Sequence, residues 1–239
     1  MNVLRLILVL LAVVVGISSD AHAQRTLVAG SSQWGMRVYT PASVETYAVW
    51  IRMPATNVNS PFISTTRGPV ADNHYRVLGY GVGFFYASIR AGVSGYNSQS
   101  NGLPLPNTWI HVAAIFDGTT NRTVWVNGVA AAAETTTVAP TSIDEVHLGR
   151  NTTSSGSTYC SADLAEPAIW HERLTAAEIG QLAAGGSFAR RAHPSKVRPD
   201  KLVWLPDLSI PGAAVPGVGG TTGISNSPAM LTAIPPSFR

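Results

Sequence analysis

The chain has 239 residues, of which 45% are hydrophobic and only 12% are charged, and its formal net charge is +3. Soluble domains usually carry about 25% charged residues, so this low share with many Thr, Ser, Gly and Pro suits an extracellular β-protein. So small a net charge argues against a nucleic-acid partner. The length fits one sandwich-type domain of about 200–250 residues, and no fixed-period repeat indicates a propeller or a solenoid.

The first 23 residues are predicted to be a secretory signal peptide. Arg5 precedes the apolar run Leu6–Gly16, and Ala21-His22-Ala23 forms a small-residue cleavage site before Gln24. An uncleaved anchor is the alternative, but the apolar run is shorter than the roughly 20 residues that a spanning helix needs. We therefore expect export to the periplasm or the extracellular space, with no membrane span after the signal is removed.

Alternating apolar and polar residues predict short strands through the first half of the chain. Tyr47, Val49 and Ile51 fall on one face of a stretch that ends at Pro54. The stretches His74–Gly79 and Phe84–Arg90 flank a Gly-rich connection of the hairpin type. Short strands separated by turn residues at this spacing predict an all-β sandwich.

The second half contains the most regular pattern. Alternation through Trp109–Phe116 and Thr123–Asn127, with Asp117-Gly118 between them, predicts a β-hairpin. Two further short strands are expected at Ile143–Leu148 and Leu164–Trp170. Pro167 interrupts the last of these, and because proline cannot donate to a ladder, it requires an edge position or an outward N–H.

One helix is predicted after these strands, at about Thr175–Ala184. Thr175 followed three residues later by Glu178 is a capping box, in which each side chain accepts a hydrogen bond from a backbone N–H of the other residue. Replacing Thr175 by Ala is expected to cost about 1 kcal/mol of stability.

The order of these elements also resembles a known family. The segments W-I-H-V-A, F-D-G, V-W-V-N-G, L-G-R, A-E-P-A-I-W and L-T-A-A-E-I, between Trp109 and Leu182, are similar to the laminin-G-like, concanavalin A-like lectin and glucanase jelly roll. The resemblance implies an antiparallel two-sheet jelly-roll sandwich with one short helix near the C-terminal end. The expected core comprises Val49, Ile51, Ile110, Val112, Ala114, Val126, Leu148, Ile169, Leu174 and Ile179.

The domain boundaries follow from this resemblance and from composition. We expect a signal peptide over residues 1–23 and one laminin-G-like jelly-roll domain over residues 24–189. Residues 190–239 are interpreted as a basic linker, a candidate return strand at Leu202–Leu205, and a Gly/Pro-rich tail. The basic residues between Arg190 and Lys201 are interpreted as a solvated surface.

The family implied by the resemblance includes glycoside hydrolases, which need two carboxyl groups facing one sugar. Retaining members carry them on one strand as E-x-D-x-x-E, a string that this sequence lacks. Asp144 and Glu145 are adjacent, and Asp163 and Glu166 are three apart, so on strands the members of each pair point apart. A pair assembled from separate strands remains an alternative, but the sequence predicts a protein without catalytic residues.

Calcium is the one metal that the resemblance suggests. Many laminin-G-like domains bind Ca²⁺ at the rim of the sandwich, and Asp72, Asn73, Asp117 and Asn121 supply oxygen ligands in predicted loops. The same residues are common in ordinary turns, so no specific metal site is assigned.

Carbohydrate sites combine aromatic rings, which pack on apolar sugar faces, with polar groups that bind hydroxyls. Aromatic and amide residues near predicted loops are therefore the candidate ligand contacts, on a loop rim of the sandwich. They are Tyr80, Tyr96, Asn97, Asn101, Asn151 and Tyr159.

These features predict a secreted, non-catalytic binding module for carbohydrate or glycosylated surfaces. The first alternative is a structural or assembly protein that decorates a phage virion or a cell surface, because similar jelly rolls have that role. The signal peptide favours the binding module, since virion proteins assembled in the cytoplasm need no export. A glycoside hydrolase without the usual acid motif is the third candidate.

Overall fold

The structure is a computed structural model that describes residues 24–27, 35–54, 59–67, 73–101, 105–154, 156–206, 208, 215–217 and 220–224. The predicted signal peptide over residues 1–23 lies outside these ranges. Within them, no helix is both long enough and apolar enough to cross a membrane.

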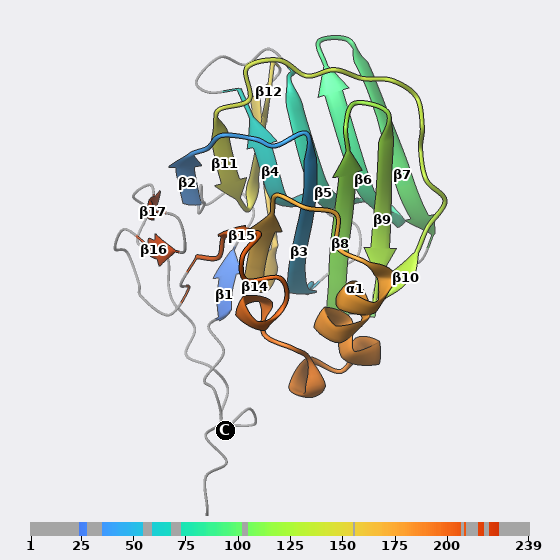
Figure 1. Cartoon of the computed structure of the whole chain (residues 1–239), viewed down its shortest axis with the longest axis vertical. Coiled ribbons are helices and arrows are strands. Elements are labelled where there is room, and N and C mark those ends of the chain that lie inside the picture. Colours follow the sequence, from blue (N-terminus) through green and yellow to red (C-terminus); the bar gives the residue numbers. More distant parts are fainter. Residues whose placement is uncertain are drawn as a thin grey trace, which may run out of the picture.

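Two antiparallel sheets form the body of the molecule, as the sequence predicts (Figure 1). The first sheet has seven strands in the order β1-β14-β3-β8-β9-β10, with β15 also paired to β14. Its strands are β1 (Gln24–Leu27), β3 (Val44–Arg52), β8 (Trp109–Asp117), β9 (Asn121–Val126), β10 (Val129–Ala130), β14 (Ala162–Trp170) and β15 (Leu202–Trp204). The strand β15 confirms the predicted return strand.

The second sheet has eight strands in the order β16-β17-β2-β11-β4-β5-β6-β7. They are β2 (Gly35–Val38), β4 (Ser60–Thr66), β5 (Tyr75–Gly81), β6 (Phe84–Ala91), β7 (Ser94–Asn101), β11 (Glu145–Leu148), β16 (Val215–Gly217) and β17 (Gly220–Ile224). A separate hairpin consists of β12 (Arg150–Thr153) and β13 (Gly156–Tyr159).

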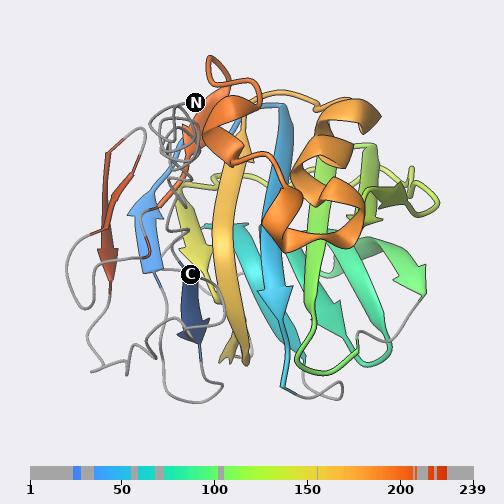
Figure 2. The ribbon, with the colours of Figure 1, turned by 90° about the horizontal axis from the view of Figure 1, so that it is seen from below.

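The predicted helix is present as α1 (Ala176–Ala183). The capping box is confirmed, because Glu178 N donates to Thr175 Oγ1 at 3.3 Å and Thr175 N donates to Glu178 Oε2 at 2.7 Å. Three short 3-10 turns follow at Ala184–Gly186, Phe188–Arg190 and Pro194–Lys196. Figure 2 shows these helical segments on one side of the first sheet and the second sheet on its other side.

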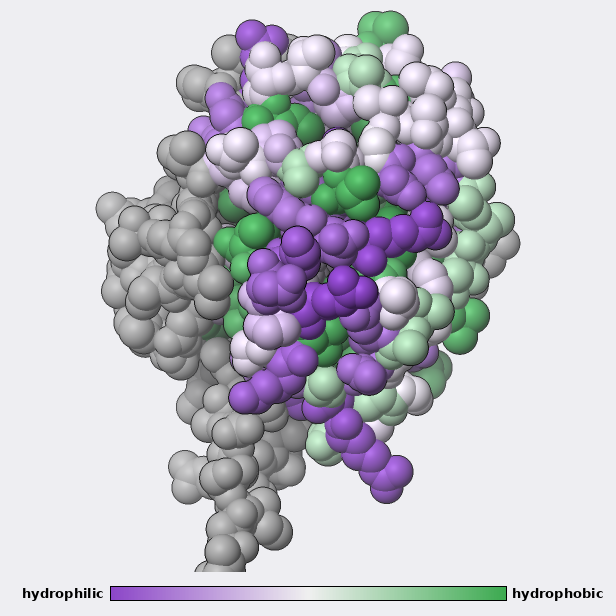
Figure 3. Space-filling view, in the orientation of Figure 1, coloured by the Kyte–Doolittle hydropathy of each residue, from purple (hydrophilic) through white to green (hydrophobic). Residues whose placement is uncertain are grey.

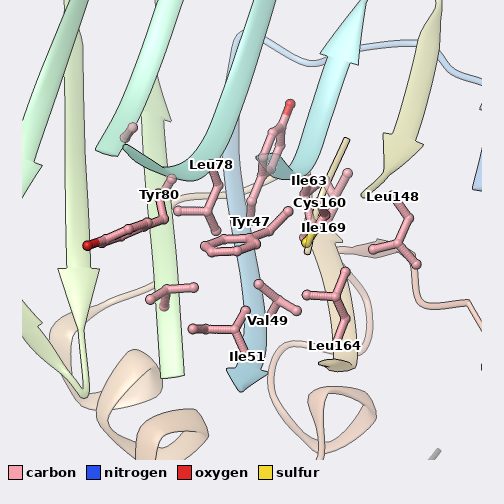
Figure 4. Packing of buried hydrophobic residues seen from close by; sticks show 14 of the residues in the cluster. Tyr47, Val49, Ile51, Ile63, Leu78, Tyr80, Leu148, Cys160, Leu164 and Ile169 are labelled. Carbon is pink, nitrogen blue, oxygen red and sulfur yellow. The ribbon is translucent and has the colours of Figure 1, made fainter. Parts of the chain in front are cut away.

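The main core lies between the two sheets. Figure 4 shows Tyr47, Val49 and Ile51 from β3 packed with Leu78 and Tyr80 from β5. Of the ten predicted core residues, seven are buried in this cluster and Val126 is partly buried against it, whereas Leu174 and Ile179 are buried in a second cluster on the outer face of the first sheet. The period-2 pattern therefore identified the inward face of the strands correctly.

Pro167 lies at a β-bulge of β14 and not at a sheet edge. The register with β3 shifts between Ala165 and Ala168, and Glu166 has a φ of 52°. A bulge removes the ladder hydrogen bond that proline could not make. It leaves Glu166 buried in an ion pair with Arg191, with Oε2 accepting from Nε at 2.7 Å and Oε1 accepting from Nη2 at 2.5 Å.

The outer face of the first sheet is closed by the helical segments; we call it the closed face. Ala168, Ala48 and Ala113 lie side by side across β14, β3 and β8, in one cluster with Ile179 and Leu182 of α1. Buried Trp side chains satisfy their donors on the covering segments: Trp50 Nε1 donates to Leu182 O at 3.2 Å, and Trp170 Nε1 donates to Val197 O at 2.7 Å. Figure 3 views the molecule from this side, where hydrophilic side chains run across the middle of the described surface.

Candidate functional site: a groove on the second sheet

The outer face of the second sheet carries a groove of about 610 Å³. Strands β4 to β7 form its floor, and the β12–β13 hairpin contributes residues on one side. Its lining residues are Asn59, Pro61, Tyr75, Val77, Gly81, Val82, Phe84, Tyr86, Ser88, Arg90, Val93, Gly95, Asn97, Asn151, Thr153 and Thr158. Leu78 of β5 and Phe85, Ala87 and Ile89 of β6 point into the core. The lining residues that alternate with them on β5 and β6 therefore lie on the opposite, outer face of the sheet.

Two aromatic rings form part of the groove floor because glycines on the adjacent strand make room for them. Tyr86 pairs with Gly79 and Phe84 pairs with Gly81 across β5 and β6. A Cβ added at Gly79 would lie 2.7 Å from Tyr86 Oη, and one at Gly81 would lie 3.0 Å from Phe84 Cζ. Both rings therefore extend over β5 and present half-buried surface to the groove.

The Tyr86 hydroxyl is oriented toward a neighbouring amide. Tyr86 Oη donates a long hydrogen bond of 3.5 Å to Asn59 Oδ1. Burial raises the pKa of the Tyr86 phenol above its usual 10.0, with the nearby Tyr75 as a smaller cause, so the hydroxyl stays protonated at neutral pH. The floor therefore combines apolar ring surface with a hydroxyl oxygen.

The β12–β13 hairpin forms a wall because the chain turns out of the second sheet at Gly149. Gly149 has a φ of 73°, which glycine adopts without the steric cost that a side chain would bring. Its N–H donates to Phe62 O and its carbonyl accepts from Cys160 N, each at 2.8 Å. Ser64 Oγ donates to Arg150 O at 2.6 Å, which fixes the hairpin over β4.

Asn151 is the most informative polar residue of this wall. The residue is only 8% exposed, and its Oδ1 has no hydrogen-bond partner among the described residues. Burying an unpaired carbonyl oxygen costs free energy, so such an atom on the lining of a groove fits a ligand or water donor. Asn97, which is exposed on β7, adds a second amide, and Ser88 adds a hydroxyl next to it across the ladder.

No Asp or Glu is among the described residues that line the groove, and Arg90 is the one charged residue of the lining. The carboxylates considered from the sequence lie elsewhere and have partners. Asp163 pairs with Arg52, and Glu166 with Arg191. Glu145 Oε2 lies 2.9 Å from His147 Nε2.

The structure brings two of the six predicted contact residues, Asn97 and Asn151, to the groove. The prediction that Tyr80 lies in a loop is wrong: it belongs to β5, is fully buried in the core and accepts a hydrogen bond from Gly83 N at 3.2 Å. The Gly-rich connection begins later than expected, because the β5–β6 ladder continues to the pair Gly81 and Phe84.

The other three predicted contacts also lie in strands, not in loops. Tyr96 is 44% exposed on β7 but faces away from the groove, with the Arg122 guanidinium 5.9 Å from its ring centre. Asn101 ends β7 and pairs with Phe84 in the ladder. Tyr159 is half-buried at the base of the hairpin, opposite Arg150.

The calcium candidates are partly engaged within the protein. Asp117 Oδ2 accepts from Arg173 Nη1 at 2.9 Å, and Asn73 is hydrogen-bonded to both the backbone N–H and the hydroxyl of Ser154. Asp72 lies outside the described residues. Within the ranges that the structure describes, no group of three or more His, Cys, Asp or Glu could hold a metal ion.

Sequence reasoning missed the central residues Phe84, Tyr86, Ser88 and Arg90. Their signal is the same period-2 alternation that identified the core, because they occupy every second position of β6 and share its outer face. Phe85, Ala87 and Ile89 occupy the inner face. Aromatic residues in a strand are usually assigned to the core, and that preference concealed the outer set.

The comparisons with known proteins agree with this fold. The family model of the concanavalin A-like lectin/glucanases superfamily matches residues 19–180, so this chain belongs to that superfamily. The match covers β1 to β14 and the beginning of α1. A search of curated proteins finds no significant match.

Two solved structures illustrate the likeness. A heptameric SAP-like pentraxin from Limulus polyphemus has a TM-score of 0.56 at 13% identity, covering 87% of this chain and 98% of the pentraxin. A protein from Bacteroides ovatus, described provisionally as a carbohydrate-binding protein, has a TM-score of 0.60 at 17% identity. That alignment covers 86% of this chain and 59% of the Bacteroides protein. At these identities the likeness establishes the fold.

Proposed function

We propose that this chain is an exported, non-catalytic carbohydrate-binding module and that the groove on the second sheet is its binding site. The observation that carries the proposal is the composition of the groove: aromatic rings on the floor, amides and hydroxyls around them, and no carboxylate among the described lining residues. Membership of a superfamily named for lectins and glucanases, and the likeness to a provisional carbohydrate-binding protein, support this class of ligand.

The chemistry of a sugar matches the groove well. One face of a pyranose ring is mostly C–H and packs on an aromatic ring, while its hydroxyls require hydrogen-bond partners at the edges. Phe84 and Tyr86 supply the ring surface. Asn97 and the unpaired Oδ1 of Asn151 supply amide groups that can accept from and donate to hydroxyls.

Within the part of the chain that the structure describes, no carboxylate lines the groove, which favours binding over hydrolysis. A glycosidase needs two carboxyl groups on opposite sides of the bond that it cleaves, about 5–10 Å apart. Among the described acids, Glu166, Asp163 and Glu45 are paired with arginines outside the groove lining. The glycoside hydrolase alternative therefore has less support than the binding module.

The test uses the mature chain, residues Gln24–Arg239, on a broad glycan panel followed by calorimetry on each hit. Tyr86→Ala is expected to weaken binding about tenfold, because one aromatic contact contributes on the order of 1 kcal/mol beyond its burial. Tyr96→Ala is the matched control: it removes an exposed aromatic side chain from the same sheet but from the side facing away from the groove. We expect it to leave affinity unchanged.

Several results would contradict the proposal. Equal loss of affinity in both tyrosine variants would place the site outside the groove. Release of reducing ends from any polysaccharide would show catalysis. A negative glycan panel together with stable oligomers or particle association would favour the assembly alternative.

Repeating the titrations with a chelator tests whether binding needs calcium.

Export is proposed from the charged start, the apolar run and the cleavage site in residues 1–23. N-terminal sequencing of protein recovered from outside the cytoplasm is expected to begin at Gln24. A full-length product retained in the membrane would show that Leu6–Gly16 acts as an anchor.

A further inference from the structure

Arg90 is the one charged side chain among the described residues that line the groove. It occupies the same outer face of β6 as Phe84, Tyr86 and Ser88, six residues from Phe84. With a rise of about 3.4 Å per residue, Arg90 lies roughly 20 Å from Phe84 along the strand. The groove therefore has an aromatic end and a cationic end.

The position of Arg90 is fixed by its neighbours on β7 and on the β6–β7 turn. It pairs with Gly95 across the ladder, and a Cβ added at Gly95 would lie 3.1 Å from Arg90 Cγ and 3.3 Å from Cδ. The aliphatic stem therefore extends over a position that has no side chain. Arg90 Nε donates to Gly92 O at 3.1 Å, which holds the guanidinium at the end of the groove.

The two terminal nitrogens of Arg90 have no hydrogen-bond or ion-pair partner in the part of the chain that the structure describes. This differs from Arg52, Arg76, Arg122, Arg173, Arg191 and Arg198, which all pair with a carboxylate. A guanidinium presents parallel donors that match a carboxylate or a similar oxyanion in two hydrogen bonds. An oriented guanidinium, in a groove whose described lining contains no Asp or Glu, therefore favours an anionic ligand group.

We propose that the groove recognises an acidic oligosaccharide, with the anionic group of one sugar on Arg90 and the ring of another on Phe84 and Tyr86. This inference rests on the proposed function, because it specifies the sugar that the same groove binds. The separation along β6 requires more than one sugar unit, so an oligosaccharide is expected to bind more tightly than a monosaccharide. Ser88 and Asn97 lie between the two ends and are available for hydroxyls.

The acid can be a carboxylate or a sulfate ester, since both offer oxygens to the guanidinium. The experiment therefore compares three forms of one oligosaccharide by calorimetry: a uronic-acid form, its carboxyl-reduced neutral form, and a sulfated derivative of the neutral form. The proteins are the wild-type mature chain and the variants Arg90→Gln, Arg90→Lys and Tyr86→Ala. Thermal unfolding of each variant confirms that it is folded.

The wild-type chain is expected to bind at least one acidic form about tenfold or more tightly than the neutral form, as for a hydrogen-bonded charge pair. Arg90→Gln is expected to abolish that preference, so that the acidic and neutral forms bind this variant with similar affinity. Arg90→Lys keeps the charge but not the paired donors, so it should retain only part of the preference. Tyr86→Ala should weaken all forms alike. Whichever acidic form binds more tightly identifies the anion.

Equal affinity for acidic and neutral forms, with no effect of Arg90→Gln, would overturn this inference and leave the proposed function intact, provided Tyr86→Ala still weakens binding. Binding of no form by the folded wild-type chain, after a negative glycan panel, would overturn the proposed function and this inference together. Loss of affinity for all three forms in Arg90→Gln would assign Arg90 a general role and also contradict the acid preference.

Discussion

The two outer faces of the sandwich use the same strand geometry for opposite purposes. On the closed face, alanines aligned across three strands bring α1 close to the first sheet, and two tryptophans donate hydrogen bonds to the covering segments. On the second sheet, glycines of β5 let Tyr86 and Phe84 lie over the strand, and the outer face stays open as the groove.

The difference shows what decides whether a sheet face becomes core or surface. Small residues leave space above the strands on both faces, alanines on the closed face and glycines in the groove. Different parts of the chain fill this space. On the closed face, Leu182 and Ile179 come from a helix and stay buried. In the groove, the room is filled by rings from the next strand of the same sheet, and those rings keep a surface that a ligand can contact. Changes on the closed face should therefore alter stability, and changes in the groove should alter binding.

The largest effect is expected for Glu166→Ala at the bulge of β14. Removing one partner of a buried ion pair leaves Arg191 without its carboxylate, which typically costs about 3–5 kcal/mol. Denaturant unfolding of the variant measures this loss, and sugar affinity of the folded fraction should be unchanged. Arg173→Ala, which breaks an exposed pair with Asp117, is the matched control and should cost about 1 kcal/mol or less. Equal losses of stability in the two variants would show that the buried ion pair contributes no more than the exposed one.

A pH dependence should come from the closed face. Burial lowers the pKa of His111 from 6.5 to about 3, so the folded state stays neutral there while the unfolded state takes up a proton. Stability is then complete above pH 6.5 and falls as the pH drops toward 3, with a slope approaching about 1.4 kcal/mol per pH unit.

Unfolding curves of the wild-type chain and of His111→Gln between pH 7 and pH 4 test this expectation. In the variant, the slope of the unfolding free energy against pH should decrease by the contribution of one proton, about 1.4 kcal/mol per pH unit at most. Burial also lowers the pKa of His147, so a smaller slope of the same sign should remain in the variant. Identical slopes in the two proteins would show that His111 is accessible to protons in the folded state.

Gly79→Ala should distinguish the two faces most directly. Its new methyl group would lie 2.7 Å from Tyr86 Oη and 2.9 Å from Ser60 O, so the ring and the strand must shift, at about 1–3 kcal/mol. Sugar affinity should fall as it does in Tyr86→Ala. Gly180→Ala on α1 meets no atom within 4 Å and should instead raise stability by about 0.5–1 kcal/mol without affecting binding. Denaturant unfolding measures the stability of both variants and calorimetry measures their sugar affinity. Unchanged affinity in Gly79→Ala would contradict the role of this glycine in placing the Tyr86 ring.

The smallest effect is expected for Thr175→Ala at the start of α1. The variant loses the acceptor for Glu178 N, which usually costs about 1 kcal/mol. An unchanged denaturation midpoint would mean that the cap contributes nothing to this helix. Sugar affinity serves as the internal reference, because α1 lies on the side away from the groove.

Much of this architecture could be predicted from the sequence because the relevant signals are local. The alternation in Val49, Ile51, Val112 and Ala114 identified the inner face of the strands, and the Thr175 and Glu178 pair fixed the helix start within one residue. The same alternation also marks the outer face of β6, but it does not show that this face forms a groove. Its floor depends on Gly79 lying beside Tyr86, a contact set by the register between strands.

The placement of Asn151 also depended on information that the sequence does not display. Its stretch contains turn-forming residues, which indicated a loop, whereas the structure forms two paired strands fixed over β4 by Ser64. Tyr80 shows the converse error. A tyrosine beside several glycines suggested an exposed turn, but the β5–β6 ladder extends past it and buries the ring.

The attachment of the β12–β13 hairpin has a consequence for how such a domain can diversify. Its base is fixed at Gly149 and Cys160, and at its far end Ser154 is hydrogen-bonded to Asn73, while its two strands pair with each other in a sheet of their own. Substitutions at Asn151, Thr153 and Thr158 would therefore change the chemistry of one groove wall without altering the ladders of the two main sheets. Ligand preference can thus evolve, or be engineered, on the hairpin while the scaffold is kept.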